Sequence, residues 1–242
     1  MIRSYGMSHV GRVRTNNEDS YVARPELHLF AVADGMGGAQ AGERASQVAI
    51  QTVVEEIERS GEDADIEDLA AAVREANRRV RAQARHAPEL AGMGTTVVAA
   101  IVYSDRIQIV NVGDSRAYLL SDGALYCITT DHSWINEVGR GLGLSDEQLR
   151  THPYRNVLTK AVGAEDQVDV QKLEIEFRPG DLLLLCSDGL HGVAGDRTIQ
   201  DVLRQGGGLR ERCEALIRAT LERGAPDNIT AVLVERVDNG DF

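Results

Sequence analysis

The hydrophobic and polar positions of the first 90 residues change period twice. Strand-like runs occupy residues 2–11 and the segment that ends at Asp34. From 41 to 59 and again from 65 to 84, apolar residues recur every three or four positions, which predicts two amphipathic helices. Acidic residues before and within the first turn of the second helix suit the positive end of its dipole.

Residues 95–130 carry four short runs rich in β-branched residues instead, separated by turn residues such as Asp122-Gly123. Asp-Gly between two such runs is a strong hairpin signal, so we expect an antiparallel meander. The weakly periodic segment 133–164 is interpreted as a flap-like segment with one short helix capped at Ser145. Two strands, a helix and a last strand are expected at residues 168–177, 181–189, about 210–223 and 228–237.

Helices that fall between groups of antiparallel strands favour an α+β fold over a parallel βαβ sheet. We therefore expect helices to cover both sides of a β-sandwich. The length of 242 residues suits a single domain over residues 1–242.

Composition narrows the class of protein. Apolar residues make up 43% of the chain and charged residues 26%, and the formal net charge is −12. This acidic balance argues against a nucleic-acid partner. The longest aliphatic run, residues 182–186, is too short to span a bilayer. Cys127, Cys186 and Cys213 show no metal-like spacing, and we interpret them as reduced core residues of a cytoplasmic protein.

Four aspartates share one sequence context. Asp34, Asp188 and Asp114 follow strand-like runs, and Asp227 precedes the last one. Carboxylates at the ends of several strands can converge at one end of a sandwich, where oxygen-only ligands favour Mg²⁺ or Mn²⁺. Asp is also a common turn residue, and two of the four precede Gly, so residue chemistry alone leaves a metal site and a set of turns equally open.

A series of motifs adds to this interpretation. The segments RTNNEDS, FAVADGMGG, GMGTTVVAA, NVGDSRAYLL, LTKAVG, LLLLCSDGL and APDNITAVLV occur in that order between residues 3 and 237. Together they resemble the metal-dependent protein phosphatases, the type 2C (PPM) protein Ser/Thr phosphatases, in a compact bacterial-type form. The resemblance implies a four-layer α-β-β-α sandwich with a cluster of metal ions at one end.

The resemblance also implies roles for the acids. Asp34 would bridge two core Mn²⁺ or Mg²⁺ ions, and the backbone carbonyl of Gly35 would bind one of them. The other implied ligands are Asp188 and Asp227 on the first ion, Glu18 and Asp19 acting through water on the second, and Asp114 with Asp188 on a weaker third ion. The loop after Asp34 is not a Walker-type phosphate cradle, because no Gly-Lys-Ser/Thr follows it.

The resemblance assigns a phosphate-binding residue but leaves the acid that protonates the leaving group unassigned. Arg14 matches the position whose guanidinium grips the phosphate. A His proposed to protonate the leaving group in many eukaryotic members is replaced by Met36, and the His often found after Gly-Gly in bacterial members is replaced by Ala39. His152, in the flap-like segment, is either an approaching acid or a loop-packing residue.

The implied activity is hydrolysis of phosphoserine and phosphothreonine by direct attack of a metal-bridging hydroxide. The expected partners are phosphorylated proteins that are targets of a Ser/Thr kinase, with no nucleic acid and no membrane contact in this chain. We expect a cytoplasmic monomer. The alternative is a pseudophosphatase or binding module with the same fold and little turnover.

Overall fold

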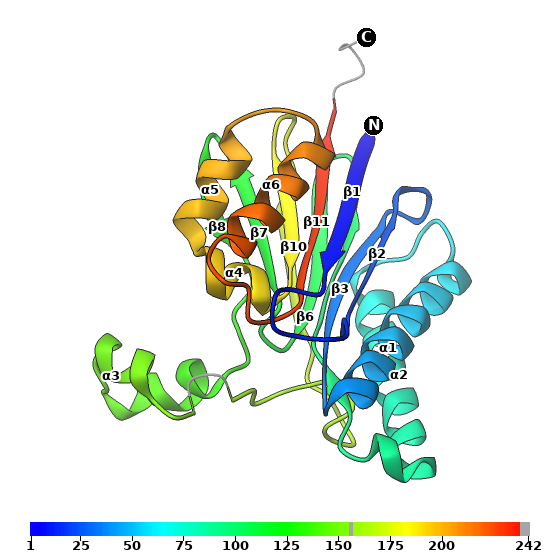
Figure 1. Ribbon diagram of the computed structural model, residues 1–242. Helices are drawn as coiled ribbons and strands as arrows, with labels where there is room; N and C mark the ends of the chain where they lie inside the picture. Colours follow the sequence, from blue (N-terminus) through cyan, green and yellow to red (C-terminus); the bar gives the residue numbers. More distant parts are fainter. Residues whose placement is uncertain (155–156, 238–242) are drawn as a thin grey trace.

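Two antiparallel β-sheets stack face to face, and helices cover both outer faces (Figure 1). The computed structural model describes residues 1–154 and 157–237. One sheet contains β2 (Asp19–Arg24), β3 (Leu29–Met36), β4 (Gly94–Thr95), β5 (Val97–Val102), β6 (Arg106–Val112) and β9 (Gln171–Glu176). The other contains β1 (Ile2–His9), β7 (Arg116–Ser121), β8 (Ala124–Cys127), β10 (Leu182–Cys186) and β11 (Ile229–Arg236). The predicted α+β sandwich is confirmed.

The helices divide between the two sheets. Figure 1 shows α1 and α2 beside β2 and β3, and α4, α5 and α6 beside the β7–β10–β11 side. The helices run over α1 (Ala39–Ser60), α2 (Ile66–His86), α3 (Asp146–Thr151), α4 (Asp188–Ala194), α5 (Asp196–Arg204) and α6 (Leu209–Leu221). Short helical turns occur at Pro25–Leu27, Pro88–Leu90, Ile135–Gly139 and Arg140–Leu142.

Alternation along the strands produces three packed layers of apolar side chains. In β3, Phe30 and Val32 point between the sheets, where they join Leu183 of β10 and Val232 of β11. Leu29, Ala31 and Ala33, on the other face of β3, belong to the cluster beneath α1 and α2. Because successive side chains of a strand alternate between faces, a strand of a middle layer must be apolar throughout.

The two predicted N-terminal helices are confirmed. Helix α2 begins after Asp65, whose carboxylate accepts hydrogen bonds from the backbone N–H groups of Glu67 and Asp68. Asp68 in turn accepts from the backbone of Asp65, which completes a capping box. Within the described residues, no helix is both long and apolar enough to cross a membrane.

Three sequence expectations were wrong. The four runs of residues 95–130 do not form one meander, because β5 and β6 belong to one sheet whereas β7 and β8 pair in the other. Helices α4 and α5 were not predicted, and Asp188 opens α4 rather than ending a strand. Cys186 and Cys213 are buried as expected, but Cys127 is exposed at the end of β8.

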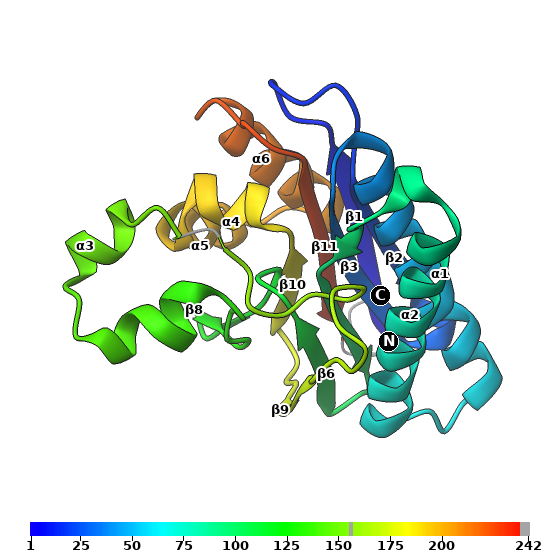
Figure 2. The same ribbon diagram turned by 90° about the horizontal axis from the view of Figure 1, so that it is seen from below.

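The flap-like segment projects away from the sandwich, as the view from below shows (Figure 2). Its predicted short helix is α3, capped by the Ser145 side chain in a capping box. Trp134 at the base stacks on His152 with ring centroids 4.1 Å apart. Lys160 Nζ lies 2.8 Å from Asp169 Oδ2 and 3.8 Å from Glu137 Oε1. These ion pairs link the flap-like segment to the residues that lead from it into β9.

Candidate active site

A hollow of about 580 Å³ lies at the end of the sandwich where the predicted acids meet. It is lined by Arg14, Glu18, Asp34, Gly35, Met36, Gly37, Gly38, Thr96, Asp114, Val157, Leu158, Asp188, Asp227 and Asn228. These residues come from the β1–β2 loop, β3, the β3–α1 loop, the β4–β5 and β6–β7 connections, the flap-like segment, α4 and the loop before β11. Segments far apart in the sequence therefore build one site.

Asp34 is held through its main chain, which hydrogen-bonds to Thr96 and pairs with Asp19 of β2 on the other side. It lies inside β3 rather than at its end, because Gly35 and Met36 continue the strand by pairing with β4. The Asp34 N–H donates to the Thr96 hydroxyl at 3.0 Å, and the Asp34 carbonyl accepts from the Thr96 N–H at 2.9 Å. Burial, and after it the charges of Asp19 and Asp188, raises the pKa of Asp34 well above its usual range.

Gly35 is required by close main-chain approach. A Cβ at this position would collide with the carbonyl oxygen of Gly42 and would lie 2.7 Å from the carbonyl oxygen of Glu18. The Gly35 N–H donates to that Glu18 carbonyl at 3.1 Å. The strand, α1 and the loop before β2 are therefore in contact at the floor of the hollow, and no side chain intervenes.

The two acids of the NNED motif have different surroundings. Glu18 lines the hollow, and Asp19 lies behind it, opposite Asp34 in the β2–β3 pairing. One Asp19 oxygen accepts hydrogen bonds from the hydroxyls of Ser187 at 2.8 Å and Thr230 at 2.6 Å, whereas its other oxygen is buried without a partner. Burial raises the pKa of Asp19 to about 7 despite these hydroxyls.

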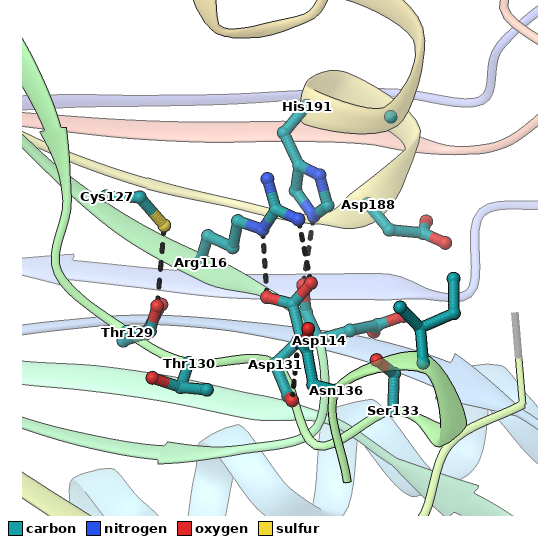
Figure 3. Close-up of a pocket in the computed structure, with 12 residues that line it drawn as sticks. Asp114, Arg116, Cys127, Thr129, Thr130, Asp131, Ser133, Asn136, Asp188 and His191 are labelled. Atoms are coloured by element: carbon teal, nitrogen blue, oxygen red, sulfur yellow. Dashed lines mark hydrogen bonds and ion pairs between the residues drawn. The ribbon is translucent and has the colours of Figure 1, made fainter. Parts of the chain in front are cut away.

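Asp188 approaches from the end of β10 in the opposite sheet, and Asp114 from the connection between β6 and β7, where the chain passes from one sheet to the other (Figure 3). Asp188 is the first residue of α4, and Asp114 follows the turn at Gly113, whose φ is +103°. Burial, and then the charge of Asp188, raises the pKa of Asp114 to about 7. Both carboxylates also line a second hollow of about 520 Å³, which adjoins the first and extends toward Arg116 and Asp131.

Arg14 and Asp227 form an ion pair. The Arg14 Nη2 lies 2.8 Å from Asp227 Oδ2, and both side chains are partly exposed, at 48% and 37%. The other Asp227 oxygen accepts from the Asn228 N–H at 2.9 Å. A guanidinium has five N–H donors, so the pair with Asp227 leaves the Arg14 fork able to bind phosphate oxygens.

None of the three positions considered for a leaving-group acid places a proton donor in the hollow within the described residues. Met36 lines the hollow and has no proton to give. The side chain of Ala39 lies outside what the structure describes. His152 is stacked on Trp134 and accepts from the Tyr154 N–H at 3.2 Å. Since His152 is not among the described residues that line either hollow, these contacts support its loop-packing interpretation.

Three residues to which the sequence analysis gave no role hold the site together. The Asn228 side chain donates to the carbonyls of Val10 and Asn16 and accepts from the Glu18 N–H at 2.7 Å, so it ties the β1–β2 loop to Asp227. His191 Nε2 donates to the Asp114 carbonyl at 2.9 Å. His132 Nδ1 accepts from the Gly113 N–H at 3.1 Å.

A motif could have found Asn228, because it lies in the quoted segment APDNIT. His191 stands three residues after Asp188, a spacing that points to a shared role only once α4 is recognised as a helix. His132 gives no local signal, because its partner Gly113 is 19 residues away.

The donor set fits hard divalent cations. Its oxygens are carboxylates, one of them the unpartnered buried oxygen of Asp19, and their mutual repulsion is relieved by positive charge. Within residues 1–154 and 157–237, no three His, Cys, Asp or Glu side chains form a ready-made ligand group. Asp227 is instead turned toward Arg14, and Asp19 toward two hydroxyls.

Known proteins match both the sequence and the fold. Residues 5–235 match the family model described as Protein phosphatase 2C. The Serine/threonine phosphatase stp of Listeria welshimeri is 36% identical over 233 residues, which cover 93% of this chain and 92% of that protein. The Serine/threonine protein phosphatase PstP of Mycobacterium tuberculosis is 39% identical over 239 residues, which cover 98% of this chain and 46% of PstP.

A solved structure extends the agreement to three dimensions. The crystal structure of the PstP catalytic domain in complex with two manganese ions has a TM-score of 0.87 and 37% identity, and the match covers 98% of this chain and 99% of that one. The resemblance inferred from the seven motifs is confirmed. With its sandwich, its converging acids and these matches, the chain belongs to the protein phosphatase 2C family.

Proposed function

We propose that this protein is a metal-dependent phosphatase that hydrolyses phosphoserine and phosphothreonine in proteins. The observation that carries the proposal is the convergence of Asp34, Asp114, Asp188 and Asp227 with Arg14 around one hollow, in a chain of the protein phosphatase 2C family. An acid-rich pocket repels a phosphate unless cations are present, so the same residues that would bind metal make the activity depend on it.

Different residues of the site would hold the metal ions and bind the phosphate. Asp34, Asp188, Asp227 and the Gly35 carbonyl would hold the two core ions, and Glu18 and Asp19 would orient water around them. When bound, divalent ions of this kind supply a nucleophilic water near neutral pH and offset charge on the phosphoryl group. The Arg14 fork faces the same hollow and would hold phosphate oxygens during attack.

Several finer features belong to the same proposal. We expect Asp114, with Asp188, to hold a weaker third ion, because only two protein carboxylates would serve it. The proposed substrates are proteins phosphorylated by a Ser/Thr kinase. We further propose that residues 1–242 act as one catalytic domain and that the protein works as a cytoplasmic monomer.

The experiment that tests the function is phosphopeptide hydrolysis with and without metal. The protein is treated with EDTA, desalted and assayed on a phosphothreonine peptide and on para-nitrophenyl phosphate, with Mn²⁺, with Mg²⁺ or with neither. We expect turnover only with metal. Asp34→Asn should be inactive under all conditions, whereas Asp105→Asn, a control in the exposed β5–β6 turn, should match the wild type. Full activity without metal would overturn the proposal.

The same assay addresses the pseudophosphatase alternative. A binding module would take up Mn²⁺ and a phosphopeptide but would release no phosphate. The Arg14→Ala variant sharpens the result, because loss of a phosphate-binding fork should raise KM for a small phosphoester while Mn²⁺ binding stays near normal. Unchanged kcat and KM in this variant would leave Arg14 as a partner of Asp227 only.

A further inference from the structure

A hollow of about 250 Å³ lies on one face of α2, apart from the acid-lined site. Its lining is Arg78, Arg81, Ala82, Arg85 and Asp166. The four α2 residues follow one another at helical spacing, so their side chains share one face of the helix. The lining thus holds three guanidinium groups and one carboxylate, in a chain whose formal net charge is −12.

The carboxylate end of the hollow is firmly held. Asn77 accepts from the Gly163 N–H at 2.6 Å and donates to the carbonyls of Glu165 at 3.0 Å and Asp166 at 3.3 Å. Arg81 donates to the Ala164 carbonyl at 2.9 Å and is also paired with Asp166. The loop over residues 163–166 is therefore fixed on α2, and Arg81, only 19% exposed, is part of that anchor.

The other two arginines are accessible from solution, although each is paired with a carboxylate: Arg85 with Asp166, and Arg78 with Glu75 through both its Nε and its Nη2. Arg78 and Arg85 are 70% and 65% exposed. Arg85 shares the single carboxylate of Asp166 with Arg81, at 3.2 Å. Arg78 is paired with Glu75, which lies outside the hollow. Even with Glu75 included, three positive side chains face two negative ones, so the hollow favours an anion.

The hollow is within reach of a substrate bound at the acid-lined site. Leu158 lines that site, and Asp166 follows it by eight residues, so the two hollows lie at most about 28 Å apart along the chain. Val162, between them, pairs with Thr95, whose hydroxyl donates to the Asp34 carbonyl at 2.8 Å. Figure 1 shows the C-terminal half of α2 at the lower end of the molecule.

We propose that this arginine hollow binds a second phosphoryl group of the same phosphoprotein substrate, and so favours substrates phosphorylated at two positions. The inference rests on the proposed function. Guanidinium forks match phosphate oxygens in geometry, and a phosphoryl group carries about 1.5 to 2 negative charges, close to the surplus of the lining residues. A single glutamate would supply only half of that charge.

The test uses three peptides that share one phosphothreonine with neutral flanks. About eight residues away they carry serine, glutamate or a phosphoserine mimic with a non-hydrolysable phosphonate. With Mn²⁺ present, we expect kcat/KM for the phosphonate peptide to be about tenfold above that for the serine peptide at low salt, and the advantage to shrink at high ionic strength. An equal gain for glutamate would overturn the assignment to phosphate.

Double variants of Arg78 and Arg85 test whether the advantage of the phosphonate peptide comes from the arginine hollow. Arg78→Glu combined with Arg85→Glu should abolish the advantage, and the milder double change to Gln should reduce it, while para-nitrophenyl phosphate turnover stays unchanged. The control is Arg59→Glu on α1, since Arg59 is 67% exposed and pairs with a glutamate three residues earlier, as Arg78 does. An advantage that survives in the folded double variants would refute the proposal.

The two hypotheses fail separately. If no phosphoester is hydrolysed with metal, the proposed function fails, and binding of the fluorescently labelled phosphonate peptide still reports on the hollow. If turnover is normal but the serine and phosphonate peptides give the same kcat/KM in the wild type, only the arginine hollow is refuted.

Discussion

Asp34 and Asp114 face the same hollow but are held by different kinds of contact. Asp34 lies in a strand that pairs with β2 on one side and β4 on the other, and its backbone bonds to Thr96. Asp114 follows a turn that is held by the imidazoles of His132 and His191. The Asp34 side thus depends mainly on strand pairing and close backbone approach, whereas the Asp114 turn has one backbone bond, from the His132 N–H to the Gly113 carbonyl at 2.9 Å, and otherwise depends on side chains.

This difference predicts which substitutions each side tolerates. A strand paired on both sides keeps its place when one side chain is lost, but it cannot absorb an added atom where main chains touch. A turn held by side chains accepts small changes of volume, but it shifts when a hydrogen-bond donor or acceptor is removed. The following predictions test that contrast.

The largest effect is expected from Gly35→Ala, on the Asp34 side. The new methyl group would meet two backbone carbonyls, which cannot rotate away as a side chain would. We expect a loss of about 3 kcal/mol in the free energy of unfolding, measured by urea denaturation, and near-complete loss of turnover. Gly141→Ala, in the flap-like segment, is the control, since nothing lies within 4 Å of its new Cβ. A Gly35→Ala protein of normal stability would contradict the contrast.

The Asp34 side was also the more predictable from sequence. Its strand, its glycines and both N-terminal helices follow from apolar spacing, and the motif around Asp34 points to a metal loop. On the other side, α4 and α5 are short and interrupted by Gly189, Gly192 and Gly195, so they show too few turns for a periodic signal. They are stabilised by tertiary packing, α4 against β11 and α6, and α5 against α6 and β8, which no local pattern reveals.

The exchange between sheets after β6 has a similar cause. The segment around Asp114 looks like a hairpin turn, and strand-like runs before and after it do not specify which sheet each will join. The contacts of His132 and His191 depend on that exchange, so they could not be predicted before the topology was known. The identity of the acids was predictable because each motif is local.

Asp114→Ala should have the next largest effect. The mutation removes a buried carboxylate that lies beside Asp188, so the metal-free protein should melt within a few degrees of the wild type. If Asp114 helps to hold a third ion, calorimetry should detect about one fewer Mn²⁺, and kcat for phosphopeptides should fall on the order of tenfold to a hundredfold. Normal turnover at matched Mn²⁺ would leave Asp114 as a turn residue.

A smaller effect is expected when only the support of Asp114 is removed. His191→Ala takes away the donor to the Asp114 carbonyl, whereas His191→Gln keeps an N–H that can donate. We expect kcat to fall about fivefold in the Ala variant with KM unchanged, and the Gln variant to recover part of the loss.

The matched change on the Asp34 side of the site is Thr95→Val. It removes the hydroxyl that donates to the Asp34 carbonyl but leaves the hydrogen bond from the Thr96 N–H to the same carbonyl. Because the strand pairing remains, kcat should change less than in His191→Ala. Equal losses in the two variants, at equal Mn²⁺ stoichiometry by calorimetry, would remove the distinction between the two sides of the site.

The smallest effect concerns pH and His132, the other support of the Asp114 turn. Burial, and then the charge of Lys160, lowers the pKa of His132, although Glu137, Asp169 and Asp131 act in the opposite direction. The folded state therefore favours the neutral ring, whose Nδ1 accepts from the Gly113 N–H. Protonation would turn this acceptor into a donor that faces another N–H group.

The sign of the pH effect follows from this depressed pKa. The stabilisation from neutral His132 is fully present above the unfolded pKa of about 6.5 and is lost as the pH falls through and below that value. His132→Gln keeps an acceptor that does not titrate, so the wild type should lose a few more degrees of melting temperature than this variant between pH 7 and 5.5. The acids of the site titrate in both proteins, so their effect cancels when the melting temperatures of the wild type and the variant are subtracted. If the melting temperatures of the two proteins fall in parallel between pH 7 and 5.5, the stability of the Asp114 turn does not depend on the protonation of a single imidazole.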